Sequence, residues 1–344
     1  MPFDRKLSLW YHENRRSMPW RGETDPYKIW ISEIILQQTR VNQGWNYYLH
    51  FIEQFPDIIS LAAAPIEKVL TVWQGLGYYS RARNLHAAAQ TIIEKFNCKF
   101  PDHYQDILSL KGIGGYTAAA IGSIAFNLPY PAIDGNLFRV VCRLFGIFDD
   151  IALPTTKKLV EEKCRLLVKE ISYSEFNQAM MDFGSLQCIP KNPDCERCPF
   201  ADRCYAFQQH AVANLPVKIN KIKVKERWLH YFLVINDRSM LIRQREGDDI
   251  WNSLFELPLI ETPNHGSQEL SMQLLQLKHP PHADFFTTHK LTHQKLNIYF
   301  YIIRNQEFHN KNEYLSIPIE NLNHYPFPKV IQKFLLDFTT IDTI

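Results

Sequence analysis

The 344-residue sequence lacks any apolar run of the roughly 18 residues that a membrane-spanning helix needs, so no span is expected. Residues 1–6 carry charge without a following apolar stretch, and no secretory signal is predicted. A strong charge bias is also missing, because the net charge of +2 permits a nucleic-acid partner without arguing for one. With 46% hydrophobic residues, the composition predicts a cytoplasmic protein of two domains with proper cores.

The seven cysteines do not form a disulfide framework, because their number is odd and a reducing cytoplasm is expected. Four of them follow the spacing Cys188-x6-Cys195-x2-Cys198-x5-Cys204. Four thiolates this close together in a cytoplasmic chain predict a metal centre. From the residues alone, zinc is the generic alternative for such a site.

Secondary structure changes in character along the chain. Apolar spacing predicts helices throughout the first part, and no convincing strand before about residue 225. A hairpin is predicted over 229–235 and 240–245, with further strands at 254–260 and 296–303 and helices near 266–277 and 328–338. In the first part, helices are expected at 3–16, 44–55, 57–63, 66–74, 80–96 and 103–109, and a further helix is expected to begin at Asp25-Pro26.

The segment Ile31–Thr39 is the first candidate for chemistry. Apolar residues recur there with helical spacing, which places Glu33 among apolar neighbours. A carboxyl in such surroundings has a raised pKa, as a general acid at neutral pH requires. A solvated glutamate on an amphipathic helix is the alternative, and this segment alone does not exclude it.

Two glycine-rich segments each enter a helix. Residues 75–83 hold two glycines, two tyrosines and two arginines, which suits phosphate contact and an aromatic wedge as well as an ordinary helix–helix turn. Residues 108–118 read as a helix, a Gly112-Ile113-Gly114-Gly115 hairpin and a second helix through Ile124, which together form an anion site for a DNA phosphate. The segment is neither a P-loop nor a dinucleotide fingerprint.

The hairpin resembles the helix-hairpin-helix of the base-excision DNA glycosylases. Residues 130–136 follow at the distance where that superfamily has its catalytic aspartate, here Asp134. Asp134 also fits a helix N-cap. The cysteine spacing matches the 4Fe–4S loop of the endonuclease III and MutY branch, whose irons take thiolate ligands, and the resemblance therefore implies a 4Fe–4S cluster.

The chain is similar to one family of that branch, the MutY adenine DNA glycosylases. Endonuclease III shares the fold and cluster spacing but carries a lysine where this chain has Tyr116, and it lacks the glutamate supplied here by Glu33. The resemblance is close over about residues 8–208. It rests on Met18-Pro19-Trp20-Arg21, Pro26-Tyr27-Lys28-Ile29-Trp30, Ser32-Glu33, Leu36-Gln37-Gln38-Thr39, Gly75-Leu76-Gly77-Tyr78-Tyr79 and Phe176-Asn177-Gln178-Ala179-Met180-Met181-Asp182.

This resemblance implies an architecture. An all-α helix-hairpin-helix glycosylase domain covers 1–208, with the hairpin over about 103–124 and the cluster loop at 188–204. A linker at 209–227 leads to an α+β, Nudix-like lesion-recognition domain over 228–344. The Nudix hydrolase box with its metal carboxylates is missing, so no nucleotide hydrolysis is expected.

The resemblance also implies residue roles. Glu33 is the acid and Asp134 the carboxylate that stabilises an oxocarbenium-like sugar. The enzyme is expected to be monofunctional, because without the lysine a Schiff-base step has no obvious nucleophile. By the same resemblance, Tyr116 and Asn136 support the two carboxyls. The adenine pocket is implied to hold Arg16, Trp20, Leu36 and Gln178. In DNA binding, Gln38 and Tyr78 are implied to act as wedges in the duplex, and Arg81, Gly112, Gly114 and Gly115 to contact the DNA.

The expected partner is double-stranded DNA with adenine opposite 8-oxoguanine or guanine, bound by a monomer and attacked after base flipping. The family reads the lesion with Phe-Ser-His, whereas this chain has Leu291-Thr292-His293. Threonine keeps the hydroxyl, but leucine cannot stack as an aromatic ring does. Two other classes remain open: an endonuclease III-like enzyme for oxidised pyrimidines, and a DNA-binding module without catalysis.

Overall fold

The computed structural model describes residues 1–219, 224–247, 249–264, 283–304 and 313–341. Its contacts divide the chain into two compact units. The first holds Met1–Ala64 and Asn84–Asn220, and the second holds Pro65–Arg83 and Lys221–Ile344. The residues described in the first unit are helical and those from 225 onward contain the strands, which confirms the predicted fold class. No helix among the described residues is long and apolar enough to cross a membrane.

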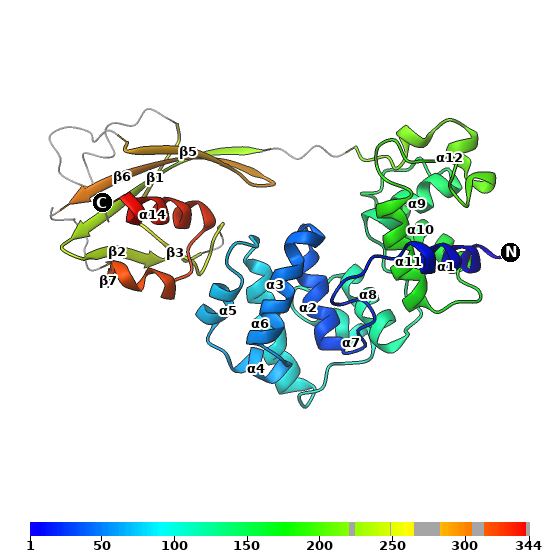
Figure 1. Cartoon of the computed structure of the whole chain (residues 1–344), viewed down its shortest axis with the longest axis horizontal. Coiled ribbons are helices and arrows are strands. Elements are labelled where there is room, and N and C mark those ends of the chain that lie inside the picture. Colours follow the sequence, from blue (N-terminus) through cyan, green and yellow to red (C-terminus); the bar gives the residue numbers. More distant parts are fainter. Residues whose placement is uncertain (220–223, 248, 265–282, 305–312, 342–344) are drawn as a thin grey trace. The chain divides into compact units, whose positions relative to one another are not determined.

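The first unit is built from helices that bury a common core (Figure 1). Helix α11 packs on α1, α8 and α9, and α2 packs on α3 and α8. The helices of the first part of the chain are α1 (Phe3–Asn14), α2 (Pro26–Leu36), α3 (Val41–Gln54), α4 (Ile58–Ala63), α5 (Ile66–Val72), α6 (Ser80–Lys95), α7 (Tyr104–Ser109), α8 (Gly115–Phe126), α9 (Gly135–Phe145), α10 (Pro154–Leu167), α11 (Tyr173–Leu186) and α12 (Tyr205–Gln208).

Helix α2 begins as its sequence predicts. The Asp25 side chain accepts the Tyr27 backbone N–H at 2.9 Å, and Pro26 occupies the first helical position. The helix ends earlier than expected, however, at Leu36. Gln38 has a left-handed backbone with φ +56°, so the prediction that Ile31–Thr39 is one helix was wrong at its C-terminal end. Beyond Leu36, the helical spacing is continued only by Gln37 and Gln38, which are polar and have no apolar core to pack against.

The predicted hairpin between α7 and α8 is present. Gly112 adopts φ +82°, and a Cβ atom built there would lie 2.6 Å from the Cβ of Asn84. Only glycine fits this combination of backbone angle and close approach. Gly114 serves as the N-cap of α8, so the backbone N–H groups of that helix begin directly after the glycines.

The second unit contains a mixed sheet of order β3-β2-β1-β6-β5, with β4 paired to β1 and β7 to β2 (Figure 1). The predicted hairpin forms between β1 and β2, where Ile235 faces Met240. The long strands β1 and β6 run parallel. The strands are β1 (Lys225–Asn236), β2 (Ser239–Gln244), β3 (Phe255–Glu256), β4 (Leu259–Thr262), β5 (Phe285–Lys290), β6 (Gln294–Arg304) and β7 (Leu315–Pro318).

One face of this sheet is covered by helix α14 (Lys329–Ile341) (Figure 1). Phe334 stacks on Phe300 of β6 with ring centroids 4.0 Å apart, and Ile331 and Leu335 join the same core. The helix predicted near 328–338 is therefore confirmed. The helix predicted near 266–277 lies outside the described residues.

Candidate functional site

A cavity of about 290 Å³ in the first unit gathers the residues predicted for chemistry and base binding. Its walls come from the segment before α2, from α2 itself, and from the N-terminal ends of α8 and α9 with α11. The volume is close to the lower end of ligand cavities, about 300 Å³, which suits one small planar group. The predicted residues that line it are Arg16, Trp20, Glu33, Leu36, Tyr116, Asp134, Asn136 and Gln178.

Glu33 is buried on α2, with only 9% of its surface exposed. Burial raises the pKa of Glu33 to about 7; the nearby Asp134 charge adds to this rise, while a hydrogen bond with Tyr116 and the Arg21 charge oppose it. The solvated glutamate that the helix alone allowed is therefore not what the fold contains. Near neutral pH this carboxyl holds a proton for part of the time, so it can act as an acid.

Asp134 is the N-cap of α9, as its sequence context allowed. One carboxyl oxygen accepts the Leu137 N–H at 2.8 Å, and the other accepts the Asn136 side-chain amide at 2.7 Å. Burial raises the pKa of Asp134, while these two hydrogen bonds work against that rise by favouring the anion. The Asp134 carboxyl thus has two hydrogen-bond donors, against the single Tyr116 phenol beside Glu33, and these favour its anionic form more strongly.

Asn136 is itself held in place. Its side-chain oxygen accepts from Arg139 Nη2 at 2.8 Å, and Arg139 Nε donates to the Cys188 carbonyl at 2.7 Å. Arg139 therefore connects the Asp134 site with the first cysteine of the metal motif. Sequence reasoning did not single out this arginine, because its bond to the Cys188 carbonyl joins positions 49 residues apart.

Two further residues were missed, namely Arg21, which lines the cavity, and Asp182, which lies behind its wall. Asp182 accepts from both Arg16 and Arg21, and Arg21 Nη1 also donates to Gln178 Oε1 at 2.7 Å. Arg21 and Asp182 both occur in the motifs that carry the resemblance, but the sequence did not show that they pair across 161 residues. The pairing holds two arginines and one amide of the cavity wall in fixed positions.

The remaining side chains of the cavity are less polar. Trp20 packs edge-on against Tyr48 with centroids 5.3 Å apart, and Tyr116 donates to the Met181 sulfur at 3.9 Å. Trp20 and Leu36 remain partly exposed. A small, partly apolar cavity lined by two carboxyls in different environments can bind a base and assist cleavage of its glycosidic bond.

The cysteine motif lies beside α9 and packs on the core of the first unit. Among the described residues, no group of three His, Cys, Asp or Glu side chains is arranged to hold a metal ion. A cluster spreads its thiolate ligands over several irons. The surroundings fit such a group, because the buried Arg143 guanidinium donates to Cys188 Sγ at 3.4 Å and places positive charge beside the thiolates.

The predicted lesion-reading residues form the turn between β5 and β6. The Leu291 N–H donates to the Gln294 carbonyl at 2.8 Å, and the Thr292 hydroxyl hydrogen-bonds to the Tyr78 hydroxyl, also within the second unit. Leu291, Thr292 and His293 line a cavity of about 220 Å³ together with Tyr78 and Trp251. Tyr78 has φ +48°, an uncommon conformation for a tyrosine.

The other residues predicted to contact DNA differ in their burial and in their place in the fold. The Arg81 guanidinium is buried, donates to the Leu76 and Gly77 carbonyls and lies 5.1 Å over the Trp73 ring. It therefore also holds the 75–79 loop. Gly112, Gly114 and Gly115 lie in the hairpin, and Gln38 follows α2 in its left-handed turn.

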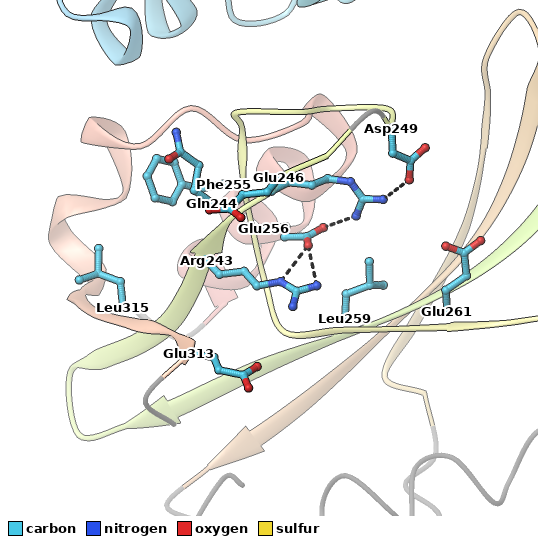
Figure 2. A pocket seen from close by; sticks show the side chains of 11 residues that line it. Arg243, Gln244, Glu246, Asp249, Phe255, Glu256, Leu259, Glu261, Glu313 and Leu315 are labelled. Atoms are coloured by element: carbon cyan, nitrogen blue, oxygen red, sulfur yellow. Dashed lines mark hydrogen bonds and ion pairs between the residues drawn. The ribbon is translucent and has the colours of Figure 1, made fainter. Parts of the chain in front are cut away.

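A second polar cavity, of about 710 Å³, lies on the sheet of the second unit (Figure 2). Glu256 accepts from Arg243 and Arg245, and Arg245 also pairs with Asp249. Arg227 joins Asp249 to Glu261. These carboxylates are thus occupied by arginines, as a structural ion-pair network.

Models of known families match three parts of the chain. The HhH-GPD superfamily of base excision DNA repair proteins matches residues 31–170, the iron-sulfur binding domain of endonuclease III matches 188–204, and the NUDIX domain matches 230–337. The chain therefore contains segments similar to a helix-hairpin-helix DNA repair domain, an iron-sulfur binding domain and a NUDIX domain.

Solved structures agree on the fold. A thermostable thymine-DNA glycosylase is 28% identical with a TM-score of 0.55, covering 60% of this chain and 95% of its own. An endonuclease III in a non-covalent DNA complex is 21% identical with a TM-score of 0.52, covering 60% and 94%. The latter likeness concerns the fold alone.

Whole-chain relatives are more specific. The chain is 33% identical to the adenine DNA glycosylase of Buchnera aphidicola subsp. Schizaphis graminum over 344 residues, 97% of each chain. It is 33% identical to that of Buchnera aphidicola subsp. Baizongia pistaciae over 346 residues, 99% and 98% of the two chains. The human adenine DNA glycosylase is 36% identical over 216 residues, 60% of this chain and 40% of its own. The chain belongs to the adenine DNA glycosylase family.

Proposed function

We propose that this enzyme removes adenine from duplex DNA in which the base is paired with 8-oxoguanine or guanine. The observation that carries the proposal is that Glu33 and Asp134 line one small cavity in different environments. Burial raises the pKa of Glu33 to about 7, whereas Asp134 accepts two hydrogen bonds from Leu137 and Asn136. Two carboxyls separated in this way provide an acid and an anion at the same pH.

In the proposed reaction, the adenine first leaves the duplex to reach the cavity. Glu33 donates its proton to N7, which turns adenine into a neutral leaving group. The C1′–N9 bond breaks with its electron pair going to the base, and the Asp134 carboxylate stabilises the positive sugar. Glu33, now a base, takes a proton from the water that attacks C1′.

The enzyme is proposed to stop after base removal. Tyr116 occupies the place of the endonuclease III lysine, and its hydroxyl lies 3.9 Å from the Met181 sulfur and is a hydrogen-bond partner of Glu33. Burial raises the pKa of Tyr116 further, so the phenol stays neutral and is a poor nucleophile. An oxidised-pyrimidine lyase is correspondingly disfavoured.

Recognition of 8-oxoguanine is assigned to the β5–β6 turn. Support comes from the Thr292 hydroxyl, which is held by Tyr78, and from the cavity that His293 and Leu291 share with Trp251. Leu291 gives apolar contact without ring stacking. Because Leu291 replaces the phenylalanine of the family, the preference of this enzyme for 8-oxoguanine over guanine depends more on Thr292 and His293 than in family members that have the phenylalanine.

The remaining parts follow from the same assignment. The four cysteines are proposed to hold a 4Fe–4S cluster with a structural role, supported by the Arg143 guanidinium beside Cys188. The Gly112–Gly115 hairpin is proposed to bind one backbone phosphate with the free N–H groups of α8. The enzyme is proposed to act as a cytoplasmic monomer on chromosomal DNA.

Single-turnover release of adenine tests the proposal. Duplexes with adenine opposite 8-oxoguanine, guanine and thymine are compared, and strand nicks are counted before and after alkali. Release from the first two duplexes, with nicks only after alkali, is expected. Nicks without alkali on an oxidised-pyrimidine duplex would favour a lyase instead, and tight duplex binding without base release would favour a binding module.

A further inference from the structure

The Asp182 carboxyl lies fully buried on α11 between two arginines of the base cavity. One of its oxygens accepts from Arg16 Nη2 at 2.6 Å, from Arg16 Nε at 3.1 Å and from Arg21 Nη2 at 3.1 Å. The other accepts the Arg16 backbone N–H at 3.4 Å. Removing one partner from a buried charge pair leaves the remaining charge uncompensated. Asp182 is thus the anion that both guanidiniums depend on.

These contacts reach the reacting groups through Arg21. Arg21 Nη1 donates to Gln178 Oε1 at 2.7 Å, while Gln178 Nε2 donates to the Ser174 carbonyl and hydroxyl at 3.3 Å each. The Arg21 Nε–H is buried and makes no hydrogen bond to the described residues. Arg21, Arg16 and Gln178 all line the cavity that contains Glu33. Their positions are therefore set by Asp182, which lies behind the cavity wall and does not line the cavity.

The charge of Arg21 acts on Glu33. The groups that bear on the Glu33 carboxyl are Tyr116 from α8, Asp134 at the start of α9 and Arg21 from the segment before α2. Of these, Arg21 is the cation, and a cation favours the anionic form of a neighbouring carboxyl. Without Asp182 as its counter-ion, the Arg21 charge would favour the anionic form of Glu33, so the proposed acid would lose its proton more readily.

We propose that Asp182 is a positioning residue for base excision: it holds Arg16 and Arg21 at the cavity wall and offsets their charge so that Glu33 keeps its proton. This inference rests on the proposed function, because it concerns the base cavity and the acid of that reaction. Asp182 does not line the cavity and acts through the two arginines.

The test compares Asp182→Asn with wild type and with a matched control, Asp4→Asn. Asp4 is also fully buried in this unit, but its carboxyl accepts the backbone N–H groups of Lys169, Glu170 and Ile171 instead. The Glu33 carboxyl is titrated directly by carbon-13 NMR, with its signal identified by its loss in Glu33→Gln. Single-turnover adenine release is measured over the same pH range.

In Asp182→Asn the titration of Glu33 is expected to fall by about one pH unit, since unpaired charges shift neighbours by about 1–3 units. Adenine release should then drop about ninefold at pH 8 but only about twofold at pH 6, because the protonated fraction of Glu33 falls by these factors when its pKa moves from about 7 to about 6. Asp4→Asn should leave both unchanged. Arg21→Gln, which removes the cation, should move the titration upward.

An unchanged Glu33 titration in a folded Asp182→Asn enzyme would overturn the inference, as would an equal shift in Asp4→Asn. If Asp182→Asn does not fold, Arg21→Gln decides, and a titration that fails to rise overturns the charge argument. Because the NMR titration needs no activity, a wild type that releases no adenine would refute the proposed function separately.

Discussion

At the level of single residues, Glu33 and Asp134 differ mainly in what satisfies each carboxyl. Glu33 has a phenol beside it and an otherwise apolar helix around it, whereas Asp134 sits at a helix N-terminus with two donors. A helix N-terminus favours negative charge. The same functional group is therefore proposed to serve two roles in one cavity, and each role can be tested separately.

The first prediction concerns pH. Since burial raises the pKa of Glu33 to about 7 and the acid must be protonated, adenine release should be fastest below pH 7. Above it, the rate should fall by about tenfold per pH unit as the proton is lost. Single-turnover rates between pH 5.5 and 9, with duplex binding measured in parallel, check this. A rate that stays level up to pH 9 would contradict the assignment of the acid.

Asp134 has a capping role as well as a chemical one, and the two can be separated. Asp134→Asn keeps an N-cap of equal quality, so the free energy of unfolding should change by less than about 0.5 kcal/mol. Adenine release should nevertheless slow by at least about 100-fold, because the charge is gone. Asp134→Ala removes the cap too and should cost about 1 kcal/mol in addition. Normal release by Asp134→Asn would leave Asp134 as a cap only.

At the level of elements, sequence patterns located most helices but not all their ends or neighbours. Asp25-Pro26 marked the start of α2, since capping is local chemistry. Its end at Leu36 was missed because polar glutamines continued the spacing. Strand β5 carries Phe285-Phe286-Thr287-Thr288 without apolar alternation, and β7 has only four residues and ends in Pro318, so neither gave a period-two signal.

The hairpin between α7 and α8 offers a matched pair of glycines. Gly112→Ala should lower the free energy of unfolding by about 1–2 kcal/mol, the cost of a left-handed backbone, with a further cost from the Asn84 contact. Gly114→Ala has open space and no positive φ, so stability should hold within about 0.5 kcal/mol. Chemical denaturation measures both.

Loss of duplex affinity in the folded Gly114→Ala enzyme would then report close approach of a phosphate to the hairpin. If Gly112→Ala proved as stable as wild type, the left-handed turn would not be needed for the fold.

A second prediction at the level of elements concerns the cysteine motif. Cys198→Ser should lose iron, visible absorbance and much of the folded protein, because the ligand set is broken. Cys98 is an exposed cysteine outside the motif, and Cys98→Ser should keep all three. Iron and zinc content of purified wild type and both variants checks this. A colourless wild type with stoichiometric zinc would refute the cluster.

At the level of the whole molecule, the sequence located individual site residues better than their couplings. Glu33, Asp134 and the four cysteines could be proposed as site residues from the sequence because each sits in a local motif. The pairing of Asp182 with Arg16 and Arg21, and the bridge from Asn136 through Arg139 to Cys188, join segments far apart in the chain. Such contacts depend on how helices pack, which periodicity alone does not determine.

The two-part architecture matches a reaction in which an undamaged base is removed. The first unit contains the cavity that we propose takes the base, and the second contains the turn that we propose reads the lesion on the opposite strand. Because adenine itself carries no damage, specificity has to come from the base opposite it. The central claim remains that Glu33 is the acid that makes adenine leave.

The most direct test of that claim is single-turnover release of adenine opposite 8-oxoguanine by wild type and by Glu33→Gln, with Glu53→Gln, an exposed glutamate, as the control. We expect release by wild type and the control, and a loss of at least about 100-fold in Glu33→Gln while duplex binding is retained. Release by Glu33→Gln at the wild-type rate would contradict the account.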